Sequence, residues 1–130
     1  MANIISIYYE AIAEFDRDFK KLEKKYQSLS SDFELMKKAT IEAYFIHKVN
    51  NNSIFPIEGL CGNGYTSNKV RKFACKSLKG RGVNSGMRVI FIFQEDISKV
   101  IFIEIYYKSD KENENKDRIK DFIKNNLIIN

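Results

Sequence analysis

A chain of 130 residues with 44 % hydrophobic and 30 % charged residues has the composition of one globular domain, residues 1–130, which excludes wholesale disorder. The net charge is +5, no run approaches the roughly 18 apolar residues that span a bilayer, and the start lacks a signal-peptide pattern, so we expect a cytoplasmic protein with no membrane partner. Two cysteines and one histidine are too few for a structural zinc site or a Cys–His nucleophile, so we expect no metal and no cofactor.

The first half of the chain predicts one strand followed by two helices. Residues 5–13 are rich in Ile and Tyr, which is typical of a β-strand. The next segment has the spacing of an amphipathic helix, whose apolar stripe is Phe15, Phe19, Leu22 and Tyr26. A second helix should end at about Phe45. Because the connection between the two helices is short, they should form an antiparallel hairpin.

The second half predicts three strands and a closing helix. We expect the strands at residues 65–77, 87–94 and 99–108, and the helix at about 113–126. Residues 87–94 are nearly all apolar, which is typical of a central strand buried on both faces. In the last strand, simple alternation separates two faces, which carry Ile101, Ile103, Ile105 and Tyr107 or Phe102, Glu104, Tyr106 and Lys108. The expected fold class is α+β, a small antiparallel β-sheet packed on an N-terminal helical hairpin in the order β-α-α-β-β-β-α.

Basic residues are concentrated in one stretch of the sequence. No acidic residue occurs between Glu58 and Glu95, where all six glycines lie. The basic residues of this stretch are Lys69, Arg71, Lys72, Lys76, Lys79, Arg81 and Arg88. Such a stretch inside a folded region is typical of a surface that binds a polyanion. The alternative is a solvated edge strand that lysines protect from aggregation.

Four segments follow one another in a recognisable order. They are Phe15-Asp-Arg-Asp-Phe19-Lys-Lys-Leu22, Ser85-Gly-Met-Arg88-Val-Ile-Phe91, Ile103-Glu-Ile-Tyr-Tyr-Lys-Ser-Asp-Lys-Glu-Asn113 and Arg118-Ile119. In this order and spacing they resemble the RelE/ParE toxins of type II toxin–antitoxin systems, and the RelE branch in particular. The resemblance covers about residues 7 to 124, so the expected arrangement of sheet and helices is RelE-like.

The resemblance implies a toxin that acts as a metal-independent mRNA endoribonuclease, on the ribosome or free of it, and so inhibits translation and growth. In this chemistry the RNA 2′-hydroxyl attacks the adjacent phosphate. The reaction needs a base, a cation that stabilises the transition state and an acid for the leaving oxygen. The implied partners are mRNA and a cognate antitoxin protein, whose acidic or amphipathic segment we expect along the basic sheet face or the helical hairpin.

The resemblance also assigns roles in catalysis and RNA binding to single residues. Arg88, in the S-G-x-R strand, is expected to contact the scissile phosphate, and the alternative is a surface ion pair with Glu104 across the sheet. Lys79 and Arg81 occupy the offsets of two catalytic lysines of the RelE branch if no gap intervenes. A gap would move these roles to Lys69 and Arg71, or to Lys76. The residues otherwise expected to position the RNA backbone are Lys69, Arg71, Lys72 and Lys76.

The end of the last strand differs from the best-known pattern of the family. Ser109 stands where the resemblance places an arginine, with Lys108 beside it. The tyrosine expected early in the closing segment is replaced by Tyr106 or Tyr107, and alternation favours Tyr106. Glu104, on the same face, is a candidate general base, and its alternative role is a structural counter-ion for Arg88.

Two other functions stay open beside the nuclease. One is inhibition of DNA gyrase, as in the ParE branch, and the other is a catalytically inactive module that binds nucleic acid or the antitoxin. The Arg88 strand and the dense basic loop favour the nuclease.

Overall fold

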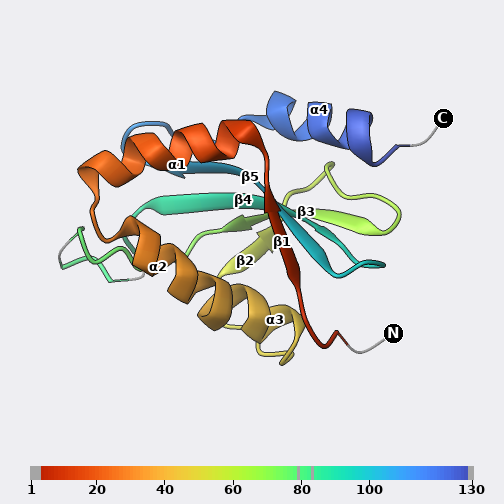
Figure 1. Ribbon diagram of the computed structural model, residues 1–130, viewed down its shortest axis with the longest axis horizontal. Coiled ribbons are helices and arrows are strands. Elements are labelled where there is room, and N and C mark those ends of the chain that lie inside the picture. Colours follow the sequence, from red (N-terminus) through yellow and green to blue (C-terminus); the bar gives the residue numbers. More distant parts are fainter. Residues whose placement is uncertain (1–3, 79, 83, 129–130) are drawn as a thin grey trace.

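A computed structural model describes residues 4–78, 80–82 and 84–128 of the chain and shows an α+β fold built on one sheet (Figure 1). In chain order, its elements are β1 (Tyr8–Ala11), α1 (Ala13–Lys25), α2 (Leu29–Met36), the π-helical turn η1 (Lys37–Glu42), α3 (Ala43–Phe45), β2 (Ile54–Pro56), β3 (Tyr65–Val70), β4 (Met87–Gln94), β5 (Lys99–Tyr107) and α4 (Lys116–Asn126). The two helical segments predicted in the first half are present, and the second of them ends at Phe45 through α2, η1 and α3 without a break.

The sheet is mixed, and the prediction of a wholly antiparallel sheet is therefore wrong. Its five strands lie in the order β1-β5-β4-β3-β2, and β1 pairs with β5 in parallel, whereas the other neighbours are antiparallel. The reason is the connection between them. After β1 the chain crosses through two helical segments, α1 and the continuous α2–η1–α3, and through the β2–β4 meander before it returns beside β1. Such a long crossover permits parallel pairing, whereas the short turn at residues 95–98 enforces antiparallel pairing of β4 with β5.

The strands differ from the sequence prediction at three places. The first strand, predicted at residues 5–13, spans only Tyr8–Ala11, because α1 already begins at Ala13. The short edge strand β2 was not predicted, and Pro56 at its end suits an edge, where its missing N–H removes no ladder bond. The next strand, β3, ends at Val70 and does not continue to residue 77. Beyond it, Phe73 and Cys75 are buried in the core, so the chain leaves the sheet in order to bury these two side chains against the helices.

The sheet is covered on both faces by apolar side chains. We call the side that packs on α1 and α2 the hairpin face; its sheet residues include Val89, Phe91, Phe93, Phe102, Ile105 and Tyr107. The opposite side is the α4 face, where Ile90, Ile92, Ile101, Ile103 and Tyr106 pack on α4 and on the chain between β2 and β3. The central strand β4 is buried on both faces, as its apolar run predicted.

A β-bulge interrupts the simple alternation expected in the last strand. Ile90 of β4 lies opposite Glu104, but its neighbour Phe91 lies opposite Phe102, so β5 carries Ile103 as an extra residue. Ile101 and Ile103 therefore face α4 while Ile105 and Tyr107 face the hairpin, and the prediction that these four share a face is wrong. Beyond the bulge, Glu104 and Tyr106 do share one face, as predicted.

The closing helix α4 is fixed to the rest of the fold at its N-terminus. Asn115 caps it, because the Asn115 side chain accepts a hydrogen bond of 3.1 Å from the Arg118 N–H. Arg118 Nη1 in turn reaches Asp18 Oδ2 of α1 at 2.6 Å and the Ile103 carbonyl at 3.1 Å. Across the described part of the chain, none of the helices has the length and apolar character needed to cross a membrane.

Candidate functional site

Strand pairing brings several of the predicted site residues together on the α4 face. Arg88 lies opposite Tyr106, and Ile90 lies between Lys69 on β3 and Glu104 on β5. Directly paired residues on neighbouring strands project from the same face of a sheet. We call the resulting cluster the Arg88 site; it consists of Lys69, Arg71, Arg88, Glu104, Tyr106, Lys111 and Glu114.

Arg88 carries a guanidinium group that forms no ion pair with any residue that the structure describes. Its Nη1 donates to the Arg71 carbonyl at 2.8 Å and to its neighbour's carbonyl at 3.4 Å. Burial lowers the pKa of Arg88, and the nearby Arg71 lowers it further, which reflects a half-buried cation without an acidic partner. The alternative of an ion pair with Glu104 is wrong, because Glu104 binds other groups. The remaining guanidinium donors are available to an anion.

Glu104 is a buried carboxylate, 2 % exposed, with both oxygens engaged. Its Oε1 accepts a hydrogen bond of 2.7 Å from the Asn115 N–H, and its Oε2 forms an ion pair with Lys111 Nζ. These contacts tie the chain beyond β5 to the α4 face. In this arrangement Glu104 is a structural counter-ion for Lys111 and has no free oxygen with which to accept a proton from RNA.

Lys69 is paired with a residue that the sequence did not single out. Its Nζ lies 2.5 Å from Glu114 Oε1, and the Glu114 side chain is only 6 % exposed. Burial opposes ionisation of Glu114, but Lys69 and the backbone N–H of Glu114 outweigh it, so the pKa of Glu114 lies below its usual value. Lys69, predicted to bind RNA, is therefore neutralised in this conformation.

Tyr106 is buried beside Arg88 and remains protonated at neutral pH. Burial raises its pKa most, and the carboxylates of Glu114 and Glu104 raise it further, against the opposing effect of Arg88. The Lys111 ammonium lies 5.6 Å from the centre of its ring. A neutral phenol of this kind can donate a hydrogen bond or a proton to an oxygen anion.

An exposed aromatic ring at the sheet edge extends the site. Phe55 on β2 lies opposite Lys69, is 39 % exposed, and has the Arg71 guanidinium 5.1 Å above its ring centre. An aromatic ring beside a basic side chain offers a stacking surface for a base next to a phosphate contact. The sequence analysis missed Phe55, and the available signal was an aromatic residue just before Pro56, the only proline of the chain.

The basic loop between β3 and β4 is anchored to the hairpin. Asp32 of α2 accepts a hydrogen bond of 2.8 Å from the Lys76 N–H, and the Ser77 N–H donates to Ser28 Oγ at 2.8 Å. Among the described residues, the exposed basic side chains of this loop are Arg71, Lys72, Lys76 and Arg81. Lys79, also predicted to be catalytic, lies outside the described residues.

The other two predicted catalytic residues that the structure describes, Arg81 and Lys108, differ in their distance from the Arg88 site. Arg81 acts electrostatically on Tyr26, which packs against Tyr107 on the hairpin face, so the structure does not bring Arg81 to Arg88. Lys108 is exposed in the turn after β5, and its N–H donates to the Gly86 carbonyl at 2.9 Å, which places it near the start of the Arg88 strand.

Cysteine and acidic residues offer no metal centre within the described residues, where no three potential ligands among His, Cys, Asp and Glu are grouped to hold an ion. Cys61 is exposed, Cys75 is buried, and both are free thiols.

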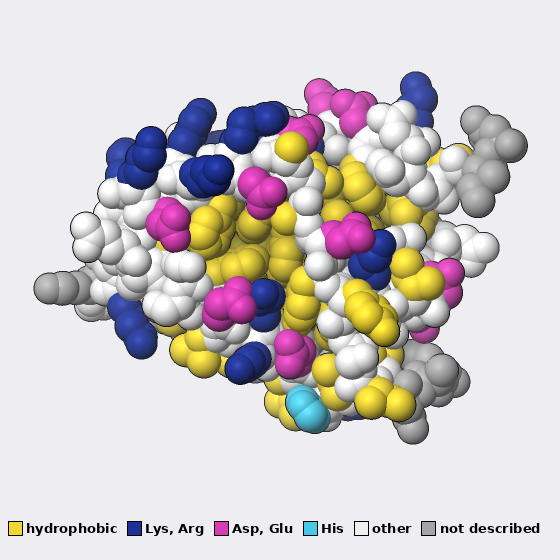
Figure 2. Space-filling view, viewed as in Figure 1, with side chains coloured by type: hydrophobic (Ala, Val, Ile, Leu, Met, Phe, Trp, Pro, Cys, Tyr) yellow, Lys and Arg dark blue, Asp and Glu magenta, His cyan; other side chains and the backbone are white. Residues whose placement is uncertain are grey.

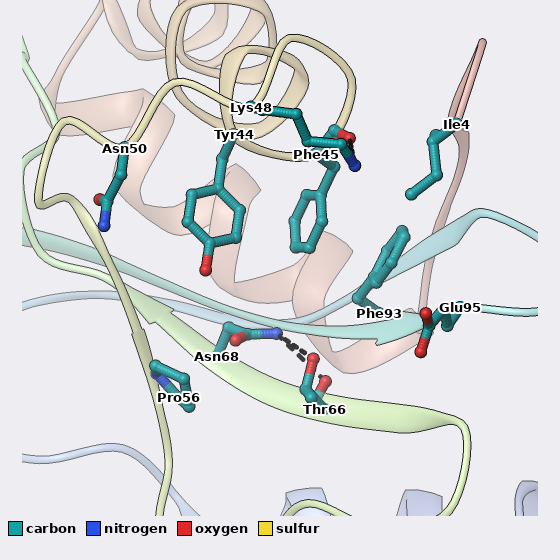
Figure 3. A pocket seen from close by; sticks show the side chains of 10 residues that line it. All are labelled: Ile4, Tyr44, Phe45, Lys48, Asn50, Pro56, Thr66, Asn68, Phe93 and Glu95. Carbon is teal, nitrogen blue, oxygen red and sulfur yellow. Dashed lines mark hydrogen bonds between the residues drawn. The ribbon is translucent and has the colours of Figure 1, made fainter. Parts of the chain in front are cut away.

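Two hollows lie on the hairpin side of the sheet. A groove of about 320 Å³ separates α1 from α2, where Figure 2 shows hydrophobic surface between the two helices; its apolar lining includes Phe15, Phe19, Phe33 and Phe102. A second hollow, of about 460 Å³, lies between α3 and the strands β3 and β4, where Tyr44 and Phe45 lie above Asn68 and Thr66 (Figure 3). The Arg88 site is on the opposite face of the sheet.

Comparison with models of protein families, with curated proteins and with solved structures finds no match for this chain.

Proposed function

We propose that this protein is a toxin of a type II toxin–antitoxin system that binds mRNA at the Arg88 site and cleaves it as a metal-independent endoribonuclease. One observation supports the RNA contact. The Arg88 guanidinium on β4 has no acidic partner among the described residues, and it lies opposite the protonated Tyr106 on the neighbouring strand β5. The resemblance of the S-G-x-R strand and the last strand to RelE-type toxins adds the cleavage reaction and the toxin role.

The proposed chemistry divides the work between these two side chains. The RNA 2′-hydroxyl gives its proton to solvent water, its oxygen attacks the adjacent phosphorus, and the bond to the 5′-oxygen breaks. The products are a 2′,3′-cyclic phosphate and a free 5′-hydroxyl, and solvent returns to Tyr106 the proton that it gives up. Arg88 holds the non-bridging phosphate oxygens, where its planar fork of donors fits two oxygens at once. Tyr106 supplies the proton to the leaving 5′-oxygen. Arg71 and Phe55 hold the neighbouring phosphate and base.

The hairpin face offers a place for the antitoxin. The groove between α1 and α2 has an apolar floor and is lined at its rim by Glu10, Asp16, Glu34 and Lys37. Between the two kinds of segment expected from the sequence, an amphipathic one fits this groove better than an acidic one, because three of these four rim residues are acidic.

The test of this proposal is controlled expression in bacterial cells, followed by mapping of mRNA 5′ ends. The wild-type chain is expected to arrest growth and to create new ends. In Arg88→Ala the new ends are expected to disappear, because the phosphate loses its bidentate partner. With purified protein, the same substitution should weaken binding of a fluorescent single-stranded RNA about tenfold or more.

The matched control is Arg17→Ala, which removes one exposed cation from α1 and should leave cleavage and RNA affinity nearly unchanged. Thermal unfolding of both variants checks that they fold. Growth arrest with intact transcripts and an induced DNA-damage response would contradict the nuclease and support gyrase inhibition. Absence of toxicity in the wild-type chain would support the inactive module.

A further inference from the structure

The chain between β5 and α4, residues 108–115, lies across the Arg88 site. Its backbone is held at both ends, by the Lys108 N–H on the Gly86 carbonyl at 2.9 Å and by the Asn115 N–H on Glu104 at 2.7 Å. Lys111 pairs with Glu104, and Glu114 pairs with Lys69. We call residues 108–115 the strap. The strap places the Glu114 carboxylate on Lys69, which would otherwise be free to bind a polyanion.

We propose that Lys69 is a ligand for a phosphodiester group of RNA and that the Glu114 carboxylate occupies the place of this group until RNA displaces it. The inference rests on the proposed RNA binding of the Arg88 site. It adds one phosphate-binding position, on Lys69, and it assigns to Glu114 the role of blocking this position in the absence of RNA; we call this blocking group the mask.

Geometry favours a phosphate on Lys69. Lys69 and Arg71 are two residues apart, one within β3 and one just beyond its end, which corresponds to about 7 Å along an extended chain. The Arg71 carbonyl accepts the Arg88 hydrogen bond, so Lys69, Arg71 and Arg88 form one continuous basic row. Neighbouring phosphates of a single strand are separated by a similar length, so a strand held by Arg88 and Arg71 reaches Lys69 with its next phosphate.

Glu114 occupies this position through one ion pair, with Lys69. Its Oε1 is buried and, among the described residues, accepts no well-directed hydrogen bond, although the Lys69 ammonium lies 2.5 Å away. Burial removes most of the hydration of this carboxylate, and its charge is balanced chiefly by the Lys69 ammonium. A phosphodiester carries the same single negative charge and spreads it over two accessible oxygens. Exchange of one anion for the other therefore leaves Lys69 paired and returns Glu114 to water.

The strap can release Glu114 without coming off the sheet. Glu104 holds the strap through Lys111 and the Asn115 N–H, and neither contact involves Glu114. The turn that follows β5 is also independent of Glu114, because the Asp110 and Lys111 N–H groups both donate to the Tyr107 carbonyl. Displacement therefore requires a local movement of residues 112–114 rather than loss of α4.

The first experiment needs no RNA and compares Glu114→Gln with Glu112→Gln. Both remove one negative charge from the strap, but Glu112 is exposed and is not paired with a described residue. Acetylation of each lysine by an amine-reactive reagent is followed by peptide mass spectrometry, with exposed Lys72 as the internal reference. We expect Lys69 to react several-fold faster in Glu114→Gln than in the wild type and at the wild-type rate in Glu112→Gln. Equal rates in all three proteins would overturn the mask.

The second experiment measures affinity for a single-stranded oligouridylate by fluorescence anisotropy at several salt concentrations. Glu114→Gln should bind several-fold tighter than Glu112→Gln, because it presents Lys69 without a competitor. In a double-mutant cycle, this gain in RNA affinity should disappear when Lys69→Gln is combined with Glu114→Gln, because the gain depends on Lys69. An equal gain in both single variants, or a gain that survives Lys69→Gln, would assign the effect to net charge and overturn the inference.

A third measurement uses the wild-type chain and so does not depend on the folding of a variant. RNA should accelerate hydrogen exchange in residues 112–114 while it slows exchange in β4. Slower exchange in the strap on RNA binding would overturn displacement. If the wild type and Glu114→Gln both fail to bind RNA, the proposed function itself is contradicted. Unchanged Lys69 acetylation in Glu114→Gln with intact RNA binding contradicts only the mask.

Discussion

Glu104 shows how burial decides the role of a single carboxylate. Its two oxygens bind the Asn115 N–H and Lys111, and the group is 2 % exposed. Glu104→Ala leaves the Asn115 N–H without its acceptor and the partly exposed Lys111 ammonium without its counter-ion. We expect it to lower the free energy of unfolding by about 2–4 kcal/mol, measured by urea denaturation.

Two further variants test whether the loss of stability comes from the contacts of Glu104. Glu104→Gln keeps an oxygen for the Asn115 N–H but loses the charge opposite Lys111, so its loss of stability should be intermediate. Glu112→Ala, on the exposed part of the strap, should change stability by no more than about 0.5 kcal/mol. If Glu104→Ala were as mild as Glu112→Ala, Glu104 would be free for proton transfer and its structural assignment would fail.

Sequence patterns could locate Arg88 and Tyr106 but not the partners of Lys69 and Glu104. Arg88 belongs to a recognisable strand segment, and the preference for Tyr106 over Tyr107 followed from alternation within one strand. The ion pair of Lys69 with Glu114 joins a strand to a distant connecting segment, so no local spacing in the sequence predicts it. Only the path of the strap across the sheet brings the two charges together.

At the level of the strands, period-two reasoning fails where the ladder contains an irregularity. Ile103 and Glu104 are consecutive residues that both face α4, because the bulge inserts one residue between the pairs made by Ile90 and Phe91. All seven residues at 100–103 and 105–107 are apolar or aromatic, so the sequence pattern does not show which face each of them takes. The position of the bulge is therefore set by packing on the two layers of helices and not by the local pattern.

The basic loop is held in place by one helix terminus. Asp32 Oδ2 accepts hydrogen bonds from the Lys76 N–H at 2.8 Å and from Ser28 Oγ at 2.7 Å, and Asp32 is buried. Asp32→Ala leaves the buried Lys76 N–H without an acceptor. We expect a loss of about 1–3 kcal/mol in the free energy of unfolding and faster hydrogen exchange at Lys76 and Ser77.

The control for the loop anchor is Glu34→Ala, which removes another carboxylate of α2, one that forms an ion pair with Lys37. It should leave exchange in the loop unchanged, because surface ion pairs contribute little. Asp32→Asn keeps an acceptor oxygen and should preserve most of the protection. Protection that survives Asp32→Ala would contradict Asp32 as the anchor and would assign that role to the Ser28–Ser77 contacts and the buried Phe73 and Cys75.

Across the whole molecule, the sequence predicted the layers better than the order of the strands. Helical and extended periodicity identified the two helical segments, β4, β5 and α4, because each pattern is local. The parallel pairing of β1 with β5 depends on how the helical crossover returns the chain to the sheet, and a short strand such as β2 carries too few residues for a period to appear. The edges of the sheet were therefore the least predictable part of the fold.

Buried phenols on both faces of the sheet should make the entire fold sensitive to alkali. On the hairpin face, burial first and then the hydrogen bond of 2.9 Å to Glu42 Oε2 raise the pKa of Tyr9. On the α4 face, burial and two carboxylates raise the pKa of Tyr106. The native state therefore retains protons that the unfolded chain releases above the ordinary tyrosine pKa of about 10.

The sign of the pH dependence follows from this difference in bound protons. Where the unfolded chain binds fewer protons than the native state, the free energy of unfolding falls as pH rises. The stabilisation from protonated Tyr9 and Tyr106 should thus be complete below about pH 10 and decline progressively above it. Tyr106→Phe removes one of the two contributions, so its urea midpoint should fall less steeply with pH than that of the wild type. The matched control is Tyr8→Phe at a side chain that is 66 % exposed. Overlapping profiles for Tyr106→Phe and Tyr8→Phe would show that the Tyr106 phenol ionises within the native fold.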